Sequence, residues 1–325
     1  MCTLNYNRDS LGTRGFTTTI FKWLFGVVAG ALLFIFLARF ALQHVAVSTA
    51  LTEREALEYL DDQLDAFRVA ESSSKILDVP ESLTLTATCD GLHAGTAARQ
   101  STTLVFAQSS LQGKIRAWTE SWDFPYPITN VFYLADASTR FLFIYNDASR
   151  AFVQGLQFPS IFSVQMMHVR DFRAERVQQE SGTKDVHLVF FTEVPHAQLI
   201  LRALPRAHVL EVQPEASQVL SHNTGTRTLY LGEEMLYGAL FSPELFPCLQ
   251  ERARERLRLV TEVYLGKTAL LQLKASDTCT LGLASLQDAL REFARAPSAV
   301  ELRALLPSLE RSHQTLRRND CAHVY

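Results

Sequence analysis

The chain has 325 residues, of which 47% are hydrophobic and 20% are charged, and its formal net charge is −3. This is the composition of a globular protein, and the length allows one large domain or two modest ones. The charge balance provides no basic surface for DNA or RNA, so we predict no nucleic-acid partner.

An uncharged apolar run from Trp23 to Ala38 dominates the N-terminal region, and with its flanks it covers residues 20–42. Lys22 and Arg39 can direct their charges into lipid headgroups, so the segment can still cross a hydrocarbon layer of about 30 Å. The run is longer than the apolar core of an export signal, and its best cleavage site, at residues 48–50, lies several polar residues beyond it. We predict a permanent transmembrane helix; the alternatives are a cleaved signal and a buried helix of a soluble protein.

Basic residues indicate the orientation of this helix, because they resist translocation. Arg8, Arg14 and Lys22 lie before or at the start of the span, whereas acidic residues dominate residues 53–65. The prediction is a single-pass protein of the inner (cytoplasmic) membrane, with residues 1–19 as a cytosolic tail and the C-terminal part outside the cytoplasm. The exported part carries no Asn-x-Ser/Thr acceptor, which suits the periplasmic side of a bacterial envelope.

A capping-box pattern, Thr52 with Glu55, predicts a juxtamembrane stalk helix over residues 51–70. Its apolar residues recur at spacings of three and four, as in a helix that packs on one partner: Leu57, Leu60, Leu64 and Phe67. Within the predicted span, Gly26 and Gly30 form a GxxxG pair, which allows two helix backbones to approach closely. Together these features motivate the hypothesis of a homodimer. The alternative is that glycine is simply frequent in membrane helices.

From about residue 76 to residue 236 the hydrophobic period changes to two, as in "LTLTATC" at residues 83–89. We interpret similar short runs as further strands, including "AFVQGLQF" at residues 151–158 and "QLILR" at residues 198–202. Turn-rich pieces such as "NDAS" and "HNTGT" separate the runs, and no helices are predicted between them. The pattern favours an extracytoplasmic, mainly antiparallel β domain, folded as a sandwich, barrel or bent sheet, and disfavours a parallel sheet.

Between residues 241 and 318 the apolar spacing returns to three and four, which predicts a helical C-terminal subdomain and an α+β class for the whole chain. Ser242 is expected to start the first helix of this subdomain. Ser298 with Glu301 is expected to start another, and Pro307 should kink or split that helix.

Five cysteines are present, and the predicted topology places one, Cys2, inside the cytoplasm. The other four would lie outside: Cys89, Cys248, Cys279 and Cys321. An even exported set permits two disulfides in three possible pairings, of which Cys248 with Cys279 is the first to test because both lie in the helical region. None forms CxxC, so we expect neither redox catalysis nor a structural zinc site.

The most unusual polar stretch is "AWTESWDFPYPITN" at residues 117–130, where aromatic residues alternate with prolines that stiffen the backbone. An exposed loop of this kind would offer contact area at a protein interface or a sugar platform. The candidate interaction loop consists of Trp118, Trp122, Phe124 and Tyr126. The alternative is that these rings cover one open end of the β core.

We predict no catalytic, cofactor-binding or metal-binding residues, because the sequence contains no nucleotide-binding, serine-hydrolase or zinc-protease motif. Five histidines of the β-rich region lack metal-ligand spacing: His168, His187, His196, His208 and His222. The expected function is a non-enzymatic scaffold, assembly or binding subunit of an envelope complex, with the membrane and a protein as partners. The alternative is a membrane-anchored envelope hydrolase whose Asp and His residues are assembled by folding.

Overall fold

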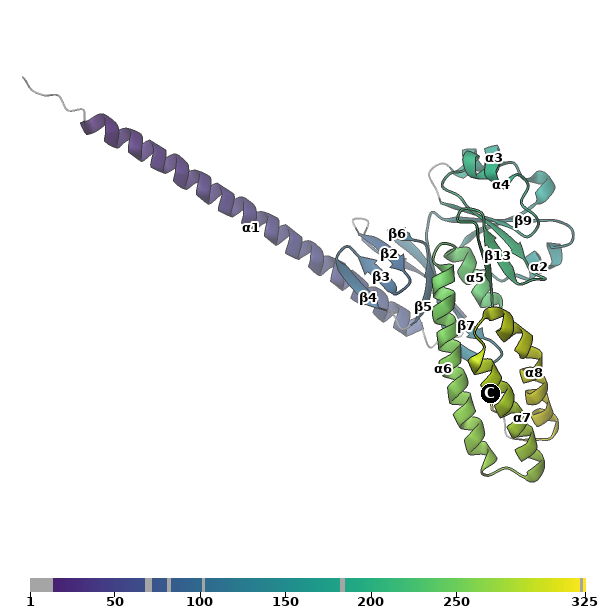
Figure 1. Ribbon diagram of the computed structural model, residues 1–325. Helices are drawn as coiled ribbons and strands as arrows, with labels where there is room; N and C mark the ends of the chain where they lie inside the picture. The colour runs from purple at the N-terminus through teal and green to yellow at the C-terminus, as the bar shows by residue number, and fades with distance from the viewer. Residues whose placement is uncertain (1–13, 68–71, 81–82, 101–102, 182–184, 322–323) are drawn as a thin grey trace, which may run out of the picture. The chain divides into compact units, whose positions relative to one another are not determined.

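The computed structural model describes residues 14–67, 72–80, 83–100, 103–181, 185–321 and 324–325. The chain forms two compact units, Met1–Thr52 and Glu53–Tyr325. Helix α1 (Arg14–Phe67) supplies the described part of the first unit, and its last turns belong to the second unit together with all other elements (Figure 1).

The apolar N-terminal segment is helical throughout. Residues Lys22–Ala41 have a mean hydropathy of 2.3, are not buried, and are long and apolar enough to cross a membrane. Thr52 lies inside α1, so the predicted capping box does not start a separate stalk helix. The reason is local: residues 43–51 contain neither glycine nor proline, and nothing in them ends a helix.

The second unit begins with two four-stranded sheets. The first has the order β1-β7-β8-β5, with β1 (Ser72–Asp78), β7 (Lys114–Asp123), β8 (Pro127–Asp136) and β5 (Leu104–Ala107). The second has the order β4-β3-β2-β6, with β4 (Ala97–Gln100), β3 (Gly91–Ala94), β2 (Thr84–Thr88) and β6 (Ser110–Gln112). Their strand pairs are antiparallel, apart from β5, which runs parallel to β8.

The leucine stripe at the end of α1 packs inside its own chain. Leu57, Leu60 and Leu64 are buried in one hydrophobic cluster with side chains of both sheets, such as Leu77 and Leu85. The side chain of Phe67 lies outside the described residues. Because these three leucines already cover an intramolecular core, the structure corrects the prediction that they face a second copy of the chain.

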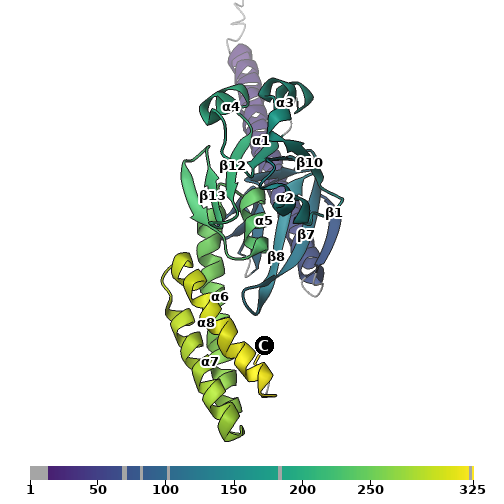
Figure 2. The same ribbon diagram turned by 90° about the vertical axis from the view of Figure 1, so that its right-hand side faces the viewer.

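A third, six-stranded sheet has the order β10-β9-β11-β12-β13-β14. Its strands are β9 (Arg140–Tyr145), β10 (Ser163–His168), β11 (Val186–Phe190), β12 (His208–Gln213), β13 (Gln218–Ser221) and β14 (Thr226–Leu229). The connections contain α2 (Arg150–Gly155), the 3-10 helix η1 (Val169–Asp171), α3 (Ala174–Ser181) and α4 (Ala197–Ala203). Helices α3 and α4 cover one face of this sheet, and α2 lies on the other (Figure 2).

The chain is therefore mixed α+β with mostly antiparallel sheets, but β10, β9, β11 and β12 are parallel neighbours. This corrects the expectation that helices and parallel pairs are missing from this region. The run "QLILR" lies in α4, and the first five residues of "AFVQGLQF", 151–155, lie in α2. A short apolar run fits a strand and a half-buried helical turn equally well, so the period alone misassigned both.

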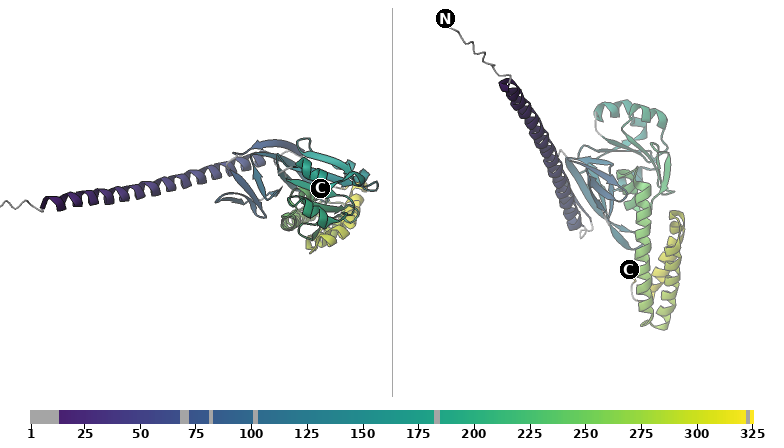
Figure 3. Two further views of the ribbon diagram at one scale, coloured as in Figure 1. Left: turned by 90° about the horizontal axis from the view of Figure 1, so that it is seen from above. Right: turned by 60° about the vertical axis from the view of Figure 1, so that its left-hand side comes forward.

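Four helices follow: α5 (Glu233–Phe241), α6 (Phe246–Gln272), α7 (Asp277–Arg295) and α8 (Ala299–Arg318). Helix α5 is buried along most of its length, and α7 packs against both α6 and α8 (Figure 3). Ser242 ends α5 instead of starting a helix, whereas the Ser298 side chain accepts a hydrogen bond from the Glu301 amide and caps α8, as predicted. Helix α8 continues through Pro307, because buried Leu302 and Leu309 hold both of its halves in the core.

Two disulfides are formed. Cys89 is bonded to Cys248, and Cys279 to Cys321, with Cα–Cα distances of 5.9 and 5.6 Å that are usual for disulfides. The pair expected first, Cys248 with Cys279, is not formed. Helix α6 separates these two cysteines by most of its length, roughly 35 Å at 1.5 Å per residue, which is far beyond bonding distance.

Candidate binding cleft

The predicted interaction loop is part of the core. The four aromatic side chains are at most 8% exposed: Trp118, Trp122, Phe124 and Tyr126. The Trp122 indole donates a hydrogen bond to the Leu231 carbonyl oxygen over 3.0 Å, and the Tyr126 ring contacts Tyr264 and Tyr325. This is the alternative in which the rings cover one end of the β core, and it corrects the prediction of an exposed contact loop.

A cleft of about 620 Å³ lies next to this aromatic cluster, between β1, β7, the segment after α2 and the start of α5. Three carboxylates line it: Glu120 of β7, and Glu233 and Glu234 in the first turn of α5. Aromatic side chains form part of its wall: Trp118, Phe158 and Tyr237. Among the described residues that line the cleft, none is lysine, arginine or histidine.

Strand geometry positions Glu120. Trp118 and Glu120 are two residues apart on β7, so both side chains point to the same face of the sheet. Ser72 of β1 lies directly opposite Glu120 in the antiparallel register. The Ser72 hydroxyl and the Trp118 indole N–H both donate to Glu120 Oε2, over 2.9 and 3.1 Å. One carboxylate oxygen is thus held in place, and the other has no hydrogen bond shown within the described part of the chain.

The other two glutamates are positioned by the start of α5. Gly232 is the N-cap residue with φ +86°, and a Cβ atom there would lie 2.7 Å from Glu234 Oε2. The positive φ favours glycine at this position, whereas the Glu234 carboxylate is the end of a flexible side chain and could move aside. One turn along the helix, the Tyr237 hydroxyl donates to Glu233 and accepts a hydrogen bond from the Gln157 amide over 3.0 Å.

The cleft destabilises negative charge. Burial, together with the charges of Asp123, Glu233 and Glu120, raises the pKa of Glu234 to about 7, against the lowering effect of a backbone hydrogen bond. Burial also raises the pKa of Glu120, although the hydrogen bonds from Ser72 and Trp118 oppose this shift. The ionic neighbours that act on both groups are other carboxylates, and the described lining of the cleft contributes no positive charge.

A cation in this cleft would supply the missing charge. It would attract the carboxylates directly, and the faces of aromatic rings also attract cations. The volume lies within the range of small-molecule sites, roughly 300 to 1,000 Å³. The arrangement can therefore hold an ammonium or guanidinium group between the carboxylates and the aromatic wall.

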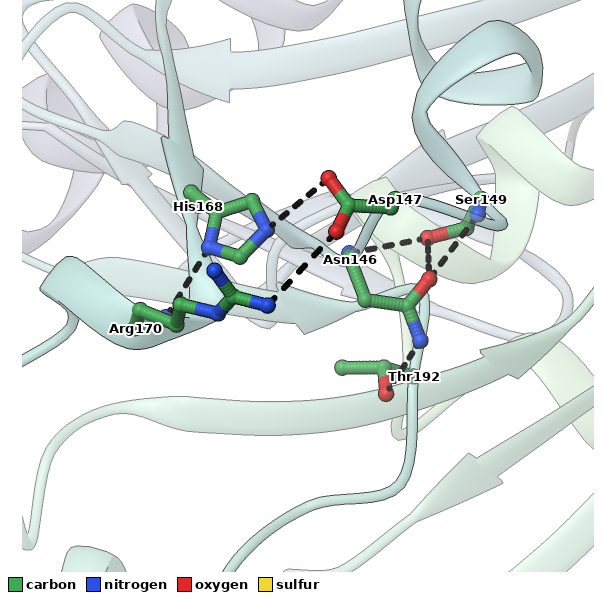
Figure 4. A network of polar contacts seen from close by, with 6 residues as sticks. All are labelled: Asn146, Asp147, Ser149, His168, Arg170 and Thr192. Carbon is green, nitrogen blue, oxygen red and sulfur yellow. Dashed lines mark hydrogen bonds and ion pairs between the residues drawn. The ribbon is translucent and has the colours of Figure 1, made fainter.

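A second polar cluster lies at the carboxyl ends of parallel strands β9, β10 and β11, where ligands of open α/β sheets usually bind (Figure 4). The Asn146 amide donates to the Thr192 hydroxyl over 3.0 Å and joins the loops after β9 and β11. Asp147 lies 3.5 Å from His168 Nε2. The Ser149 hydroxyl donates to Asn146, so this serine is not arranged as a nucleophile beside the histidine.

The remaining histidines have structural surroundings. His187 is fully buried, and its Nδ1–H donates to the Leu240 carbonyl oxygen over 2.7 Å. Burial lowers the pKa of His187 to about 3, and the nearby His208 ring lowers it further. His222 Nε2 lies 3.2 Å from Glu211, and His196 precedes α4 in a left-handed conformation. Within the described ranges, no cluster of three or more His, Cys, Asp or Glu side chains is arranged to hold a metal ion.

Comparison with protein-family models, with curated proteins and with solved structures finds no match to this chain. The interpretation of the cleft therefore depends on its own geometry. Sequence reasoning singled out Trp118 but missed Glu120, Glu233 and Glu234. The local signals were the Trp-x-Glu spacing on one strand and the pair of acidic residues after Gly232, and neither signal indicates that the two segments meet.

Proposed function

We propose that the chain is a membrane-anchored, non-enzymatic binding subunit of the cell envelope, and that its acidic cleft binds a ligand with an ammonium or guanidinium group. The anchor would be residues 20–42, and residues 53–325 would lie outside the cytoplasm. The apolar stretch of α1 supports the anchor, and two disulfides suit an oxidising compartment outside the cytoplasm.

One observation carries the binding proposal. Glutamates from two separate elements converge on a cleft with an aromatic wall, and burial raises the pKa of Glu120 and Glu234 while no cation lines the described cleft. An isolated protein gains nothing from such an arrangement, because buried charge without a counter-charge is destabilising. A bound cation converts the same groups into favourable contacts. The cation would belong to a small amine or to a Lys or Arg side chain of an envelope protein.

Titration of the full chain in detergent micelles tests the proposal. The probes are choline and its neutral carbon isostere dimethylbutanol, followed by an arginine amide as the guanidinium probe. Binding is measured by calorimetry and by the change in tryptophan fluorescence, to which Trp118 in the cleft lining contributes. We expect choline or the arginine amide to bind and the neutral isostere not to bind. Equal binding of choline and dimethylbutanol would contradict a cation site.

Matched variants locate the site. Glu120→Gln and Glu234→Gln keep the side-chain shape and remove the charge, and each should weaken cation binding by about tenfold, or 1.4 kcal/mol. Glu193→Gln removes an exposed charge outside the cleft and should leave binding unchanged. Equal weakening by all three variants would indicate attraction by the overall charge of the protein instead of a defined cleft.

A second candidate function has one observation in its favour. With a pKa of about 7, Glu234 is partly protonated at neutral pH, as is required of a general acid in glycoside hydrolysis, and Glu120 is a second carboxylate in the same cleft. The sequence had suggested a hydrolase that uses Asp and His residues. In this second candidate function, the two glutamates would take the catalytic roles instead. Release of an aryl leaving group from chromogenic glycosides, lost in both Gln variants, would favour this function over simple binding.

A further inference from the structure

Helix α6 carries an apolar stripe that the described part of its own chain leaves exposed. The opposite face of α6 is buried and includes Leu249 and Leu257. The stripe consists of Leu259, Val263, Gly266, Leu270 and the C-cap residue Leu273. The side chains of its four large residues are 45, 70, 67 and 81% exposed, in chain order. Such a face normally marks a contact with another protein surface.

The spacing of this stripe is that of a coiled-coil seam. Its members follow one another at intervals of four, three, four and three residues, so Val263 and Leu270 take heptad position a, and Leu259, Gly266 and Leu273 take position d. A Cβ atom on Gly266 would have no neighbour within 4 Å in the described chain, so packing within the chain does not require a glycine there. A small residue in a seam instead allows a second helix to come close.

The charges beside the seam select the partner and its direction. Glu262 takes position g and Lys267 position e of the next heptad. In a parallel, in-register pair of identical helices, Glu262 of each copy faces Lys267 of the other. In an antiparallel pair, glutamate would face glutamate and lysine would face lysine. Lys267 also donates to the Val324 carbonyl oxygen, and an ammonium group keeps two further donors for Glu262.

We propose that α6 pairs in parallel with α6 of a second copy through this seam, so that the protein self-associates through its C-terminal subdomain. Two heptads are too short for a strong coiled coil in dilute solution. The association is expected where the chains are concentrated in one membrane, because confinement raises the effective concentration of the two helices.

Crosslinking of the full chain in membranes tests this proposal. In a Cys2→Ser background, Val263→Cys and Leu270→Cys are treated with a short bismaleimide, and the control is Arg258→Cys, an exposed residue of α6 outside the seam. We expect each seam variant alone to form covalent dimers at least several-fold more than the control. Dimers no more frequent than in the control would overturn the proposal. So would dimers that appear only when the two seam variants are mixed, because these indicate an antiparallel pair.

Reversing the charges of Glu262 and Lys267 in the Val263→Cys background distinguishes specific pairing through the seam from nonspecific hydrophobic association. Glu262→Lys and Lys267→Glu each place like charges across the pair and should reduce dimer formation several-fold. The double variant restores opposite charges and should restore the dimers. Thermal unfolding is followed in parallel, because Lys267 also contacts the C-terminal segment. If the single variants unfold as the parent does and the dimer level stays unchanged, the charged part of the proposal is wrong.

Discussion

At the scale of single residues, two ionisable groups of the second unit have strongly shifted pKa values, and their surroundings differ. Glu234 borders an open cleft whose described lining holds no cationic side chain, whereas His187 is fully buried and hydrogen-bonded to a backbone carbonyl. Burial raises the pKa of the acid and lowers that of the base. The two groups therefore change stability in opposite directions as the pH rises.

Glu234 should make the protein less stable above neutral pH. Its pKa rises from 4.5 to about 7 on folding, so its contribution is fully present below pH 4.5 and is lost as the pH rises through 7. The Glu234→Gln variant should remove this loss, which we expect to be about 2 kcal/mol after allowance for partial solvent exposure. Urea unfolding at pH 5 and pH 8.5 measures the difference, with Glu193→Gln as the control. An identical pH dependence in parent and Glu234→Gln protein would contradict the account.

His187 should cause the opposite trend in acid. Its pKa falls from 6.5 to about 3 on folding, so its contribution is present above pH 6.5 and is lost as the pH falls towards 3. The free energy of unfolding should decrease by about 1.4 kcal/mol per pH unit in this window because of this one group. The His187→Gln variant should be less stable at pH 7, but its free energy of unfolding should decrease less steeply as the pH falls below 6.5. If the free energy of unfolding of the variant fell as steeply with decreasing pH as that of the parent, other groups would control acid unfolding.

At the scale of elements, the same helical pattern has two uses in this chain. The end of α1 and the outer face of α6 both present apolar residues at spacings of three and four. The leucines of α1 are buried by sheets of their own chain, whereas the seam of α6 is exposed. Spacing predicts that a helix needs an apolar partner, but it does not say whether the partner belongs to the same chain.

Truncation of Leu60 tests the intramolecular role of α1. Leu60 is 1% exposed, so Leu60→Ala should lower the free energy of unfolding by about 2 to 5 kcal/mol. The control is Tyr59→Ala on the exposed face, where Tyr59 is 46% exposed, with an expected change within about 0.5 kcal/mol. Thermal unfolding at several protein concentrations measures both. A loss that depends on concentration would instead place Leu60 in an interface between copies.

At the scale of the whole molecule, the helix, the disulfides and the charge asymmetry agree on one topology. The apolar helix suits a bilayer, the acidic flank favours export, and in the proposed orientation both disulfides would lie outside the cytoplasm. Position 2 carries the remaining cysteine, which the topology places in the cytosol. We therefore predict two classes of cysteine: Cys2 as a free thiol in the cytosol, and four disulfide-bonded cysteines outside it.

Cysteine labelling of intact spheroplasts checks this topology. A membrane-impermeant maleimide added outside should not label Cys2 until the cells are lysed. After mild denaturation without a reductant, the other four cysteines should remain unlabelled, because they are bonded in pairs. Protease added outside should degrade residues 53–325. Protection of that segment in intact spheroplasts would overturn the orientation.

Features that depend on local pattern could be predicted from the amino-acid sequence. A long uncharged stretch predicts the apolar helix, period two predicts strands such as β2, and Ser298 predicts the start of α8. The ends of helices were predicted less well, because a local capping pattern does not show whether the preceding residues are helical too. Thr52 resembles a helix cap but lies within a continuous helix, because no adjacent residue ends it.

The contacts between distant segments were not predictable from the sequence and are defined by the fold. Ser72 and Glu120 line the same cleft as Glu234, although more than a hundred residues separate them from it in the sequence. The neighbouring order of β10, β9 and β11 likewise brings together strands that are not consecutive. Local periodicity carries no information on such pairings, because the same apolar strand can pair with any other. The cleft, the disulfide pairing and the exposed face of α6 all depend on such long-range contacts. They could therefore be identified only from the folded structure.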